Sequence, residues 1–259
     1  MILRGNLFSQ KLEMETSITI VAPDKHTGSP YKVVYLLHGL CGRSGDWVDY
    51  TMLPNYTKDY DAVFIMPEVA RSFYTDMRYG LSYQSYVSEE LPLMVSNLFN
   101  ISKRREDAAV IGASMGGYGA LKCVLSKPEQ YGFCGAFSSP CLMLKEHLEY
   151  SEGAKRFEEL FGERLFKDFQ AAFGEKIEWN PKEDVVELAK EAKDKPNKPE
   201  LYLACGTEDF LHNDNKRYQG LLQELGYDST FEDWQGNHNW TFFDEALKRA
   251  LKHWLEGNK

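Results

Sequence analysis

The chain has 259 residues, of which 43% are hydrophobic and 27% are charged. This composition is ordinary for a globular protein, and the length fits one α/β domain that carries insertions. The formal net charge is -9, from 30 Lys and Arg against 39 Asp and Glu, and the sequence shows no basic cluster, so we expect no nucleic-acid partner.

The first hundred residues predict strands that alternate with turns and helices. Four apolar runs of strand length occur there, at residues 7–10, 17–21, 31–37 and 62–66. The last two are strongly apolar, as central parallel strands are. Helices are expected over residues 46–53 and 83–99, and Pro92 is expected to kink the second one.

The same alternation continues to the end of the chain. Further strands are predicted at residues 107–111, 133–137, 201–205 and 229–233. Helices are predicted at residues 118–126, 213–225 and 240–255. Strands that alternate with helices in this way predict an α/β fold with a mainly parallel, doubly wound sheet.

Residues 142–198 differ in composition, because they are rich in Lys and Glu with interspersed aromatic residues. Apolar residues recur there at spacings of three or four, which favours a core-facing helical stripe: Phe157, Leu160, Phe161, Leu165, Phe169 and Phe173. Asn180 and Pro181 predict the cap and the first position of a further helix. We therefore expect a helical insertion between two strands, within a single domain that spans residues 1–259.

The stretch 112–117, with the sequence GASMGG, fits the pattern G-x-S-x-G. It lies between the strand predicted at 107–111 and the helix predicted at 118–126, which is the context of a nucleophile elbow. Such an elbow would raise the hydroxyl of Ser114 above the sheet edge, at a helix N-terminus that favours a developing anion. The alternative is that Ser114 only caps the helix.

A serine nucleophile needs a general base and an acid that orients this base. In α/β enzymes with such an elbow, the chain order is serine, acid, histidine. Among six histidines, only His238 follows the last predicted strand in a loop of small residues, so it is the expected base. Asp209, just after the strand at 201–205, is the expected acid, and Glu208 and Asp214 are its alternatives.

The tetrahedral intermediate of acyl transfer carries an oxyanion, which backbone amides can bind. One expected donor is Met115, directly after the nucleophile, and the other is Leu40, in the loop that begins with His38-Gly39. The sequence shows no metal-ligand spacing, no P-loop and no dinucleotide fingerprint. We therefore expect neither a metal nor a cofactor.

The amino end lacks the apolar core of a secretion signal, and no apolar run has the length of a membrane span. We therefore expect a cytoplasmic protein with no membrane partner. None of the five cysteines forms a C-x-x-C pair, and reduced, mainly structural thiols are expected. The sequence leaves open whether the chain forms a homo-oligomer.

The elbow at residues 112–121 resembles that of the esterase D-like α/β-hydrolases. This family includes tributyrin esterases, S-formylglutathione hydrolases, feruloyl and acetyl xylan esterases, and mycolyltransferases. Four further segments agree with the family and follow in its order: residues 36–40, 66–76, 89–92 and 236–240. The tributyrin-esterase branch looks most similar, because of the His38-Gly39 pair and the loop at residues 73–76.

This resemblance implies the α/β-hydrolase fold and a carboxylesterase that acts on small-molecule esters with short acyl groups. The family's catalytic triad falls on Ser114, Asp209 and His238, the residues reached above from their positions along the chain. The insertion at residues 142–198 matches no branch of the family, so the resemblance leaves the choice of substrate open.

Alternative functions follow from particular residues. Cys41, near the expected oxyanion loop, keeps an S-formylglutathione hydrolase in view. Feruloyl or acetyl xylan esterase activity is another alternative, because Tyr74 and Tyr79 could bind a substrate by stacking on its ring. A catalytically silent scaffold or carbohydrate-binding protein is a third, although such proteins usually lack a member of the triad.

Overall fold

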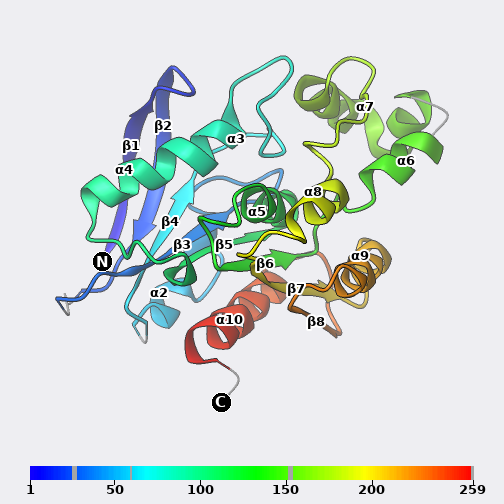
Figure 1. Ribbon diagram of the computed structural model, residues 1–259. Helices are drawn as coiled ribbons and strands as arrows, with labels where there is room; N and C mark the ends of the chain where they lie inside the picture. The colour runs from blue at the N-terminus through cyan, green and yellow to red at the C-terminus, as the bar shows by residue number, and fades with distance from the viewer. Residues whose placement is uncertain (25–27, 59, 151–153, 258–259) are drawn as a thin grey trace.

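The computed structural model describes residues 1–24, 28–58, 60–150 and 154–257, and one eight-stranded sheet forms its centre (Figure 1). The strands lie side by side in the order β1-β2-β4-β3-β5-β6-β7-β8. Their bounds are β1 (Ile2–Ser9), β2 (Met14–Val21), β3 (Lys32–Leu37), β4 (Ala62–Pro67), β5 (Ala108–Ala113), β6 (Phe133–Phe137), β7 (Glu200–Gly206) and β8 (Ser229–Trp234). All the predicted strands are present, and β1 begins earlier in the chain than expected.

Antiparallel pairing is confined to one side of the sheet, where β1 pairs with β2 and β2 pairs with β4. Each pairing from β4 across to β8 is parallel, which confirms the mainly parallel sheet. Parallel strands end at the same edge of a sheet, and ligands of α/β folds bind beyond that edge. The loops that follow β3, β5, β7 and β8 therefore meet there.

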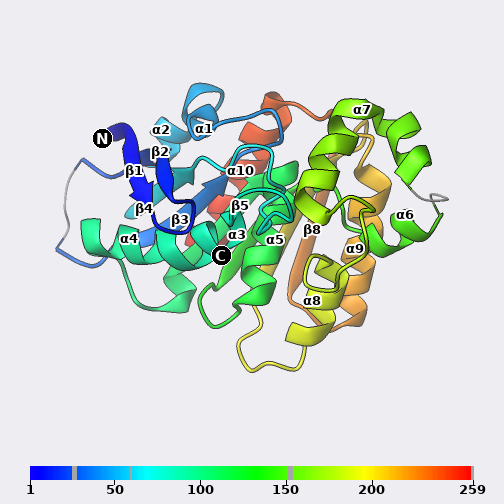
Figure 2. The ribbon, with the colours of Figure 1, turned by 90° about the horizontal axis from the view of Figure 1, so that it is seen from above.

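Helices cover both faces of the sheet (Figures 1 and 2). The smaller apolar cluster lies under α1 (Asp46–Asp49), α2 (Leu53–Tyr56) and α10 (Trp240–Glu256). The larger cluster lies under α3 (Tyr83–Ser85), the π-helical turn η1 (Tyr86–Glu90), α4 (Leu91–Leu98), α5 (Met115–Ser126), α8 (Val185–Ala192) and α9 (His212–Glu224). This is the predicted doubly wound arrangement.

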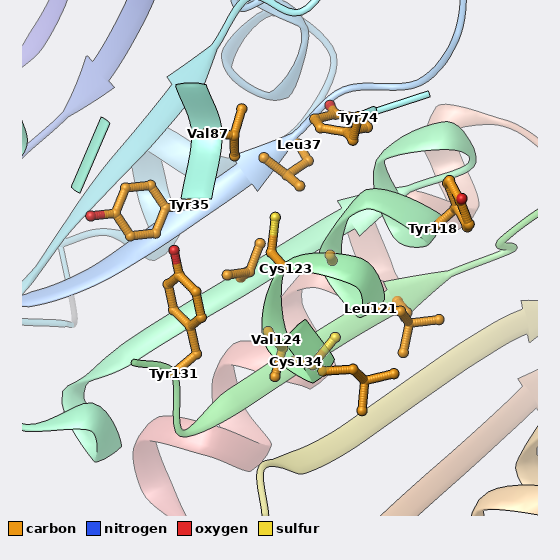
Figure 3. Close-up of a cluster of buried hydrophobic side chains, with 14 of the residues drawn as sticks. Tyr35, Leu37, Tyr74, Val87, Tyr118, Leu121, Cys123, Val124, Tyr131 and Cys134 are labelled. Carbon is orange, nitrogen blue, oxygen red and sulfur yellow. The ribbon is translucent and has the colours of Figure 1, made fainter. Parts of the chain in front are cut away.

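Helix α5 lies at the centre of the larger cluster. Figure 3 shows Cys123 and Val124 of this helix among side chains from several other elements, including Leu37 of β3. The ring of Tyr35 meets that of Tyr131 edge to face, with centroids 6.1 Å apart. Residues 115–125 of α5 are all buried, so the helix is fixed on every side.

The predicted insertion contains α6 (Leu144–Tyr150), α7 (Ala154–Phe173) and α8, and Figure 1 shows α6 and α7 projecting beyond one end of the sheet. Gly162, with φ of 80°, divides α7 into two helices. The ring of Phe169 packs on Phe73 with centroids 4.5 Å apart, as a core-facing stripe predicts. The side chains of Phe157, Leu160 and Phe161 lie outside the described part of the chain.

The helix start predicted at Asn180 is wrong. Helix α8 begins at Val185, because Asp184 is its cap and accepts a hydrogen bond from the Val186 amide at 2.9 Å. Asn180 instead accepts from the Lys182 amide at 3.1 Å, within a turn that precedes the helix.

The kink expected at Pro92 is a change of helix type. The π-helical turn η1 continues directly into α4, and Pro92 lies in the first turn of α4. Likewise, the single helix expected at residues 46–53 is two short helices, α1 and α2. No described helix combines the length and the apolar composition that a membrane span requires.

Candidate active site

Ser114 lies between β5 and α5 with φ of 55° and ψ of −125°, a backbone conformation that residues other than glycine rarely adopt. Neighbouring glycines permit this sharp turn. A Cβ atom at Gly112 would lie 2.1 Å from the Gly116 oxygen, and one at Gly116 would lie 2.2 Å from the Leu37 oxygen. The structure thus has the strand, the strained turn and the helix of a nucleophile elbow.

Asp209 and His238 lie on adjacent loops, after β7 and β8. Nδ1 of His238 is 2.9 Å from Oδ2 of Asp209, whose side chain is completely buried. Burial raises the pKa of Asp209, but hydrogen bonds from His238, the Leu211 amide and Ser138 outweigh it and lower this pKa below its ordinary value. A charged carboxylate can only accept, so Nδ1 carries the hydrogen and Nε2 of His238 is left to act as a base.

The two alternative acids have other partners. Glu208 is exposed and accepts hydrogen bonds from the side-chain amides of Gln235 and Asn237, at 3.1 and 2.9 Å. Asp214 lies in the first turn of α9, 3.4 Å from Nε2 of His147. Among the carboxylates that the structure describes, Asp209 is the one that pairs with the ring of His238.

The other described histidines contact partners other than Asp209. Each has an oxygen partner: His38 with the Gly39 carbonyl, His147 with Asp214, His212 with Asp233, and His253 with Glu200. His26 lies outside the described residues. The role of His238 as the general base stays a prediction, and its pairing with the buried Asp209 supports it.

Ser114 and His238 line one cavity of about 540 Å³, which we name the histidine-side cavity. In the described part of the chain, no hydrogen bond joins the Ser114 hydroxyl to the His238 ring. In sites without substrate such bonds are often long, and they shorten when the substrate binds. The ring of His238 packs against Phe210 and Phe243, with centroids 5.1 and 5.3 Å away.

A second cavity, of about 390 Å³, shares Ser114 and Leu40 with the first, and we name it the insertion-side cavity. Its walls are mainly apolar and include Leu144, Leu148, Leu165, Phe169 and Phe210. The histidine-side cavity is instead bordered by charged and amphipathic groups that include Arg43, Asp46, Tyr50 and Trp240. Ser114 thus borders two compartments of different chemistry.

The two expected oxyanion donors lie beside Ser114. Met115 is the first residue of α5, and Leu40 borders both cavities. The loop lies directly beside the nucleophile, because a Cβ atom at Gly39 would be in ordinary van der Waals contact with Cβ of Ser114, 3.4 Å away. Within the described part of the chain, the amides of Leu40 and Met115 donate no hydrogen bond to another protein group, so both are available to a ligand.

The expectation that Tyr74 binds substrate is wrong. Its side chain is completely buried, and its hydroxyl donates to the His38 oxygen at 2.9 Å. The ring packs on α5 so closely that a Cβ atom at Gly119 would lie 2.4 Å from it. Tyr79 is 61% exposed but is absent from the described linings of both cavities, so a substrate-binding role for it stays a prediction.

Sequence reasoning missed Phe210, which joins the insertion-side cavity to the ring of His238. Its side chain is 77% exposed although it is large and apolar. A bulky aromatic residue directly after the expected acid, Asp209, is the signal that could have revealed it.

Comparison of the sequence with known proteins finds relatives along almost the whole chain. The sequence profile of the family described as "Putative esterase" matches residues 9–254. An acetyl esterase of Caldicellulosiruptor saccharolyticus is 26% identical over 267 residues, which cover 98% of this chain and 97% of the relative.

Comparison of the fold leads to two solved structures from Staphylococcus aureus. Fluorophosphonate-binding serine hydrolase F, in a substrate-bound form, superposes with a TM-score of 0.84 at 27% identity, over 98% of both chains. An S-formylglutathione hydrolase superposes with a TM-score of 0.83 at 27% identity, also over 98% of both chains.

Proposed function

The chain belongs to the esterase family, as a serine carboxylic ester hydrolase of the α/β-hydrolase fold, and from this premise we propose that it cleaves small-molecule esters with short acyl groups. This is the substrate class implied by the resemblance to tributyrin esterases. In this proposal Ser114 is the nucleophile, His238 the general base and Asp209 the acid that orients the base.

In the first step, Oγ of Ser114 attacks the carbonyl carbon of the ester while Nε2 of His238 takes the hydroxyl proton. The charged Asp209 accepts the hydrogen bond from Nδ1 and stabilises the imidazolium that forms. The carbonyl oxygen becomes an oxyanion, which accepts hydrogen bonds from the Leu40 and Met115 amides. The N-terminus of α5 adds its partial positive charge.

The protonated His238 then gives its proton to the alcohol oxygen as the carbon–oxygen bond breaks. The alcohol must therefore leave on the side of the imidazole, so the histidine-side cavity holds the alcohol and the insertion-side cavity holds the acyl group. A water molecule replaces the alcohol, and His238 takes one of its protons as the water attacks the acyl carbonyl. Collapse of the second tetrahedral intermediate releases the carboxylic acid and restores Ser114.

The observation that carries this proposal is the 2.9 Å contact between His238 and the buried Asp209, on the cavity that also holds the strained Ser114. A lone serine at a helix start does not need a histidine and a buried carboxylate beside it. The pairing supports a role for Ser114 beyond helix capping.

The experiment is replacement of Ser114 by Ala, with hydrolysis of p-nitrophenyl butyrate as the assay. We expect kcat/KM to fall by about three or more orders of magnitude, because the nucleophile is lost while the fold remains. Ser126→Ala, at the far end of α5, is the matched control and should keep wild-type activity. A fluorophosphonate probe should label the wild type and Ser126→Ala but not Ser114→Ala, and full activity of Ser114→Ala would end the proposal.

A second candidate function is an S-formylglutathione hydrolase. The similar structure from Staphylococcus aureus bears that name, and Cys41 and Arg43 border the histidine-side cavity, where the leaving thiol would lie. Rates on a glutathione thioester and on oxygen esters of two to eight acyl carbons separate the two functions. Methyl ferulate in the same panel tests the feruloyl alternative, because an aromatic acyl group would have to enter the insertion-side cavity.

We also propose a cytoplasmic location, and the five cysteines, all of them free thiols, support it. Cell fractionation followed by detection of the enzyme tests this proposal. Self-association into a homo-oligomer stays open, and sedimentation of the purified protein tests it.

A further inference from the structure

Arg71 links the helical insertion to the loop that carries the Leu40 amide. Its Nε and Nη2 atoms lie 2.8 and 2.5 Å from Oδ2 of Asp168, on helix α7. Its Nη1 atom donates to the Leu40 oxygen at 3.4 Å and lies 3.5 Å from Sγ of Cys41. The proposed steps of ester hydrolysis use neither Arg71 nor Asp168, although Arg71 contacts the residue that supplies one oxyanion donor.

The shorter contacts of Arg71 are those of its ion pair with Asp168. The Asp168 side chain is 9% exposed and that of Arg71 is 30% exposed, so water screens the pair only in part. Two N–H groups of the guanidinium converge on one carboxylate oxygen, which fixes the plane of the guanidinium. The contact with Leu40 is longer, so Asp168 orients Arg71, and Arg71 in turn limits the movement of Leu40.

The Leu40 oxygen, which accepts the longer hydrogen bond from Arg71, belongs to a tight turn. The Gly42 amide donates to the Gly39 oxygen at 3.0 Å, which closes a four-residue turn with Leu40 and Cys41 at its centre. The two common turn types differ mainly by rotation of the central peptide, whose oxygen is that of Leu40. A donor on this oxygen therefore holds the turn in one of the two forms.

The peptide that precedes it is held as well. The Gly39 oxygen also meets Nδ1 of His38 at 2.8 Å. The Leu40 N–H belongs to the same planar peptide as the Gly39 oxygen, so the contacts of that oxygen set the direction of the N–H. Arg71 holds the following peptide through the Leu40 oxygen, so residue 40 is fixed on both sides of its Cα atom.

We propose that Arg71 is a positioning residue for ester hydrolysis, which keeps the Leu40 amide aimed at the oxyanion while Asp168 holds Arg71 in place. This inference rests on the proposed function of Ser114 and Leu40. Asp168 shares α7 with Leu165 and Phe169, which line the insertion-side cavity. The insertion therefore forms one wall of the acyl compartment and, through the same helix, fixes a donor to the oxyanion.

The test compares Arg71→Met and Asp168→Asn with the wild type on p-nitrophenyl butyrate. Loss of one oxyanion donor costs about a hundred- to a thousandfold in kcat, and misplacement of a donor that is still present should cost about ten- to a hundredfold. We expect KM to stay within about threefold, because the oxyanion forms only in the transition state.

A second readout separates positioning from a general loss of structure. A trifluoromethyl ketone forms a tetrahedral adduct with an oxyanion, so its Ki should rise in both variants in parallel with the loss of kcat/KM. The double variant should be no slower than Arg71→Met, because both changes remove the same link. Arg164→Gln is the matched control, since Arg164 lies 3.7 Å from the other oxygen of Asp168 at the surface, and it should keep wild-type rates.

Wild-type kcat in Arg71→Met and Asp168→Asn would overturn the inference, and so would an equal loss in Arg164→Gln. If Arg71→Met does not fold, Asp168→Asn decides, because that variant keeps the guanidinium. An active Ser114→Ala variant would instead refute the proposed function. An inactive Ser114→Ala together with a fully active Arg71→Met refutes the role of Arg71 alone.

Discussion

Glu68, directly after β4, connects three segments around the oxyanion loop. Its carboxylate oxygens accept hydrogen bonds from the backbone amides of Ser44 at 3.0 Å and Ala70 at 2.9 Å. Its Oε1 atom lies 3.4 Å from Nε2 of His38. Burial raises the pKa of Glu68, but the His38 ring and the two amides outweigh burial and lower this pKa from 4.5 to about 2. The charged form of Glu68 is therefore part of the folded state.

The Glu68→Gln variant tests this contribution through its pH dependence. A carboxyl group whose pKa is lowered by folding stabilises the protein fully above its unfolded pKa and ceases to do so as the pH falls through its folded pKa. We expect the wild type to be more stable by about 1 to 2 kcal/mol at pH 7, with the difference closing between pH 4.5 and about 2. Urea unfolding of both proteins at several pH values measures it, and a difference that is constant with pH would contradict the assignment.

At the scale of elements, the close contact of α5 with β3 and β5 positions the nucleophile. The glycines at 112 and 116 let the helix start lie directly on the two strands, and a side chain at either position would overlap backbone atoms. Backbone atoms cannot rotate away as side chains can, so the elements themselves would have to separate. The turn that holds Ser114 would move with them.

The Gly116→Ala variant should therefore be less stable by about 2 kcal/mol or more, and slower in ester hydrolysis, despite the higher helix propensity of alanine. Gly220→Ala in α9 is the matched control, because a Cβ atom there meets nothing within 4 Å. That variant should gain about 0.5 to 1 kcal/mol. Chemical unfolding of both variants measures the two free energies, and similar values for them would refute the close contact.

Lys122 connects helix α5 to two segments of the chain that are distant from it in sequence. It lies on α5 with its side chain completely buried, and its ammonium pairs with Glu183 of the insertion. The same ammonium donates to the backbone oxygen of Tyr74 at 3.1 Å and lies 5.4 Å from the centre of the Tyr118 ring. Three parts of the chain that are distant in sequence therefore share one buried cation.

Removal of this cation should destabilise the molecule strongly. We expect Lys122→Ala to cost about 3 to 5 kcal/mol, because Glu183 and the Tyr74 oxygen would lose a buried charged partner. Lys190→Ala is the comparison, since Lys190 pairs with Glu187 at 2.8 Å on the surface with half of its side chain exposed. That change should cost less than about 1 kcal/mol. Thermal unfolding measures both, and equal shifts in Tm would contradict the role of Lys122.

The sequence by itself determined the features that depend on neighbours along the chain. Apolar runs and helical spacing predicted the parallel strands and the doubly wound sheet, and the glycines around Ser114 predicted the elbow. The order of elements selected His238 and Asp209, because loops after parallel strands meet at one edge of a sheet.

Only the tertiary structure decided what depends on contacts between distant segments. Tyr74 proved to be a buried core residue rather than a substrate contact, since the same aromatic side chain suits either place. The links from Arg71 to Asp168 and from Lys122 to Glu183 join residues separated by 97 and 61 positions. No local pattern encodes which charged side chains will be buried together, because that choice is made when the layers of the fold pack against one another.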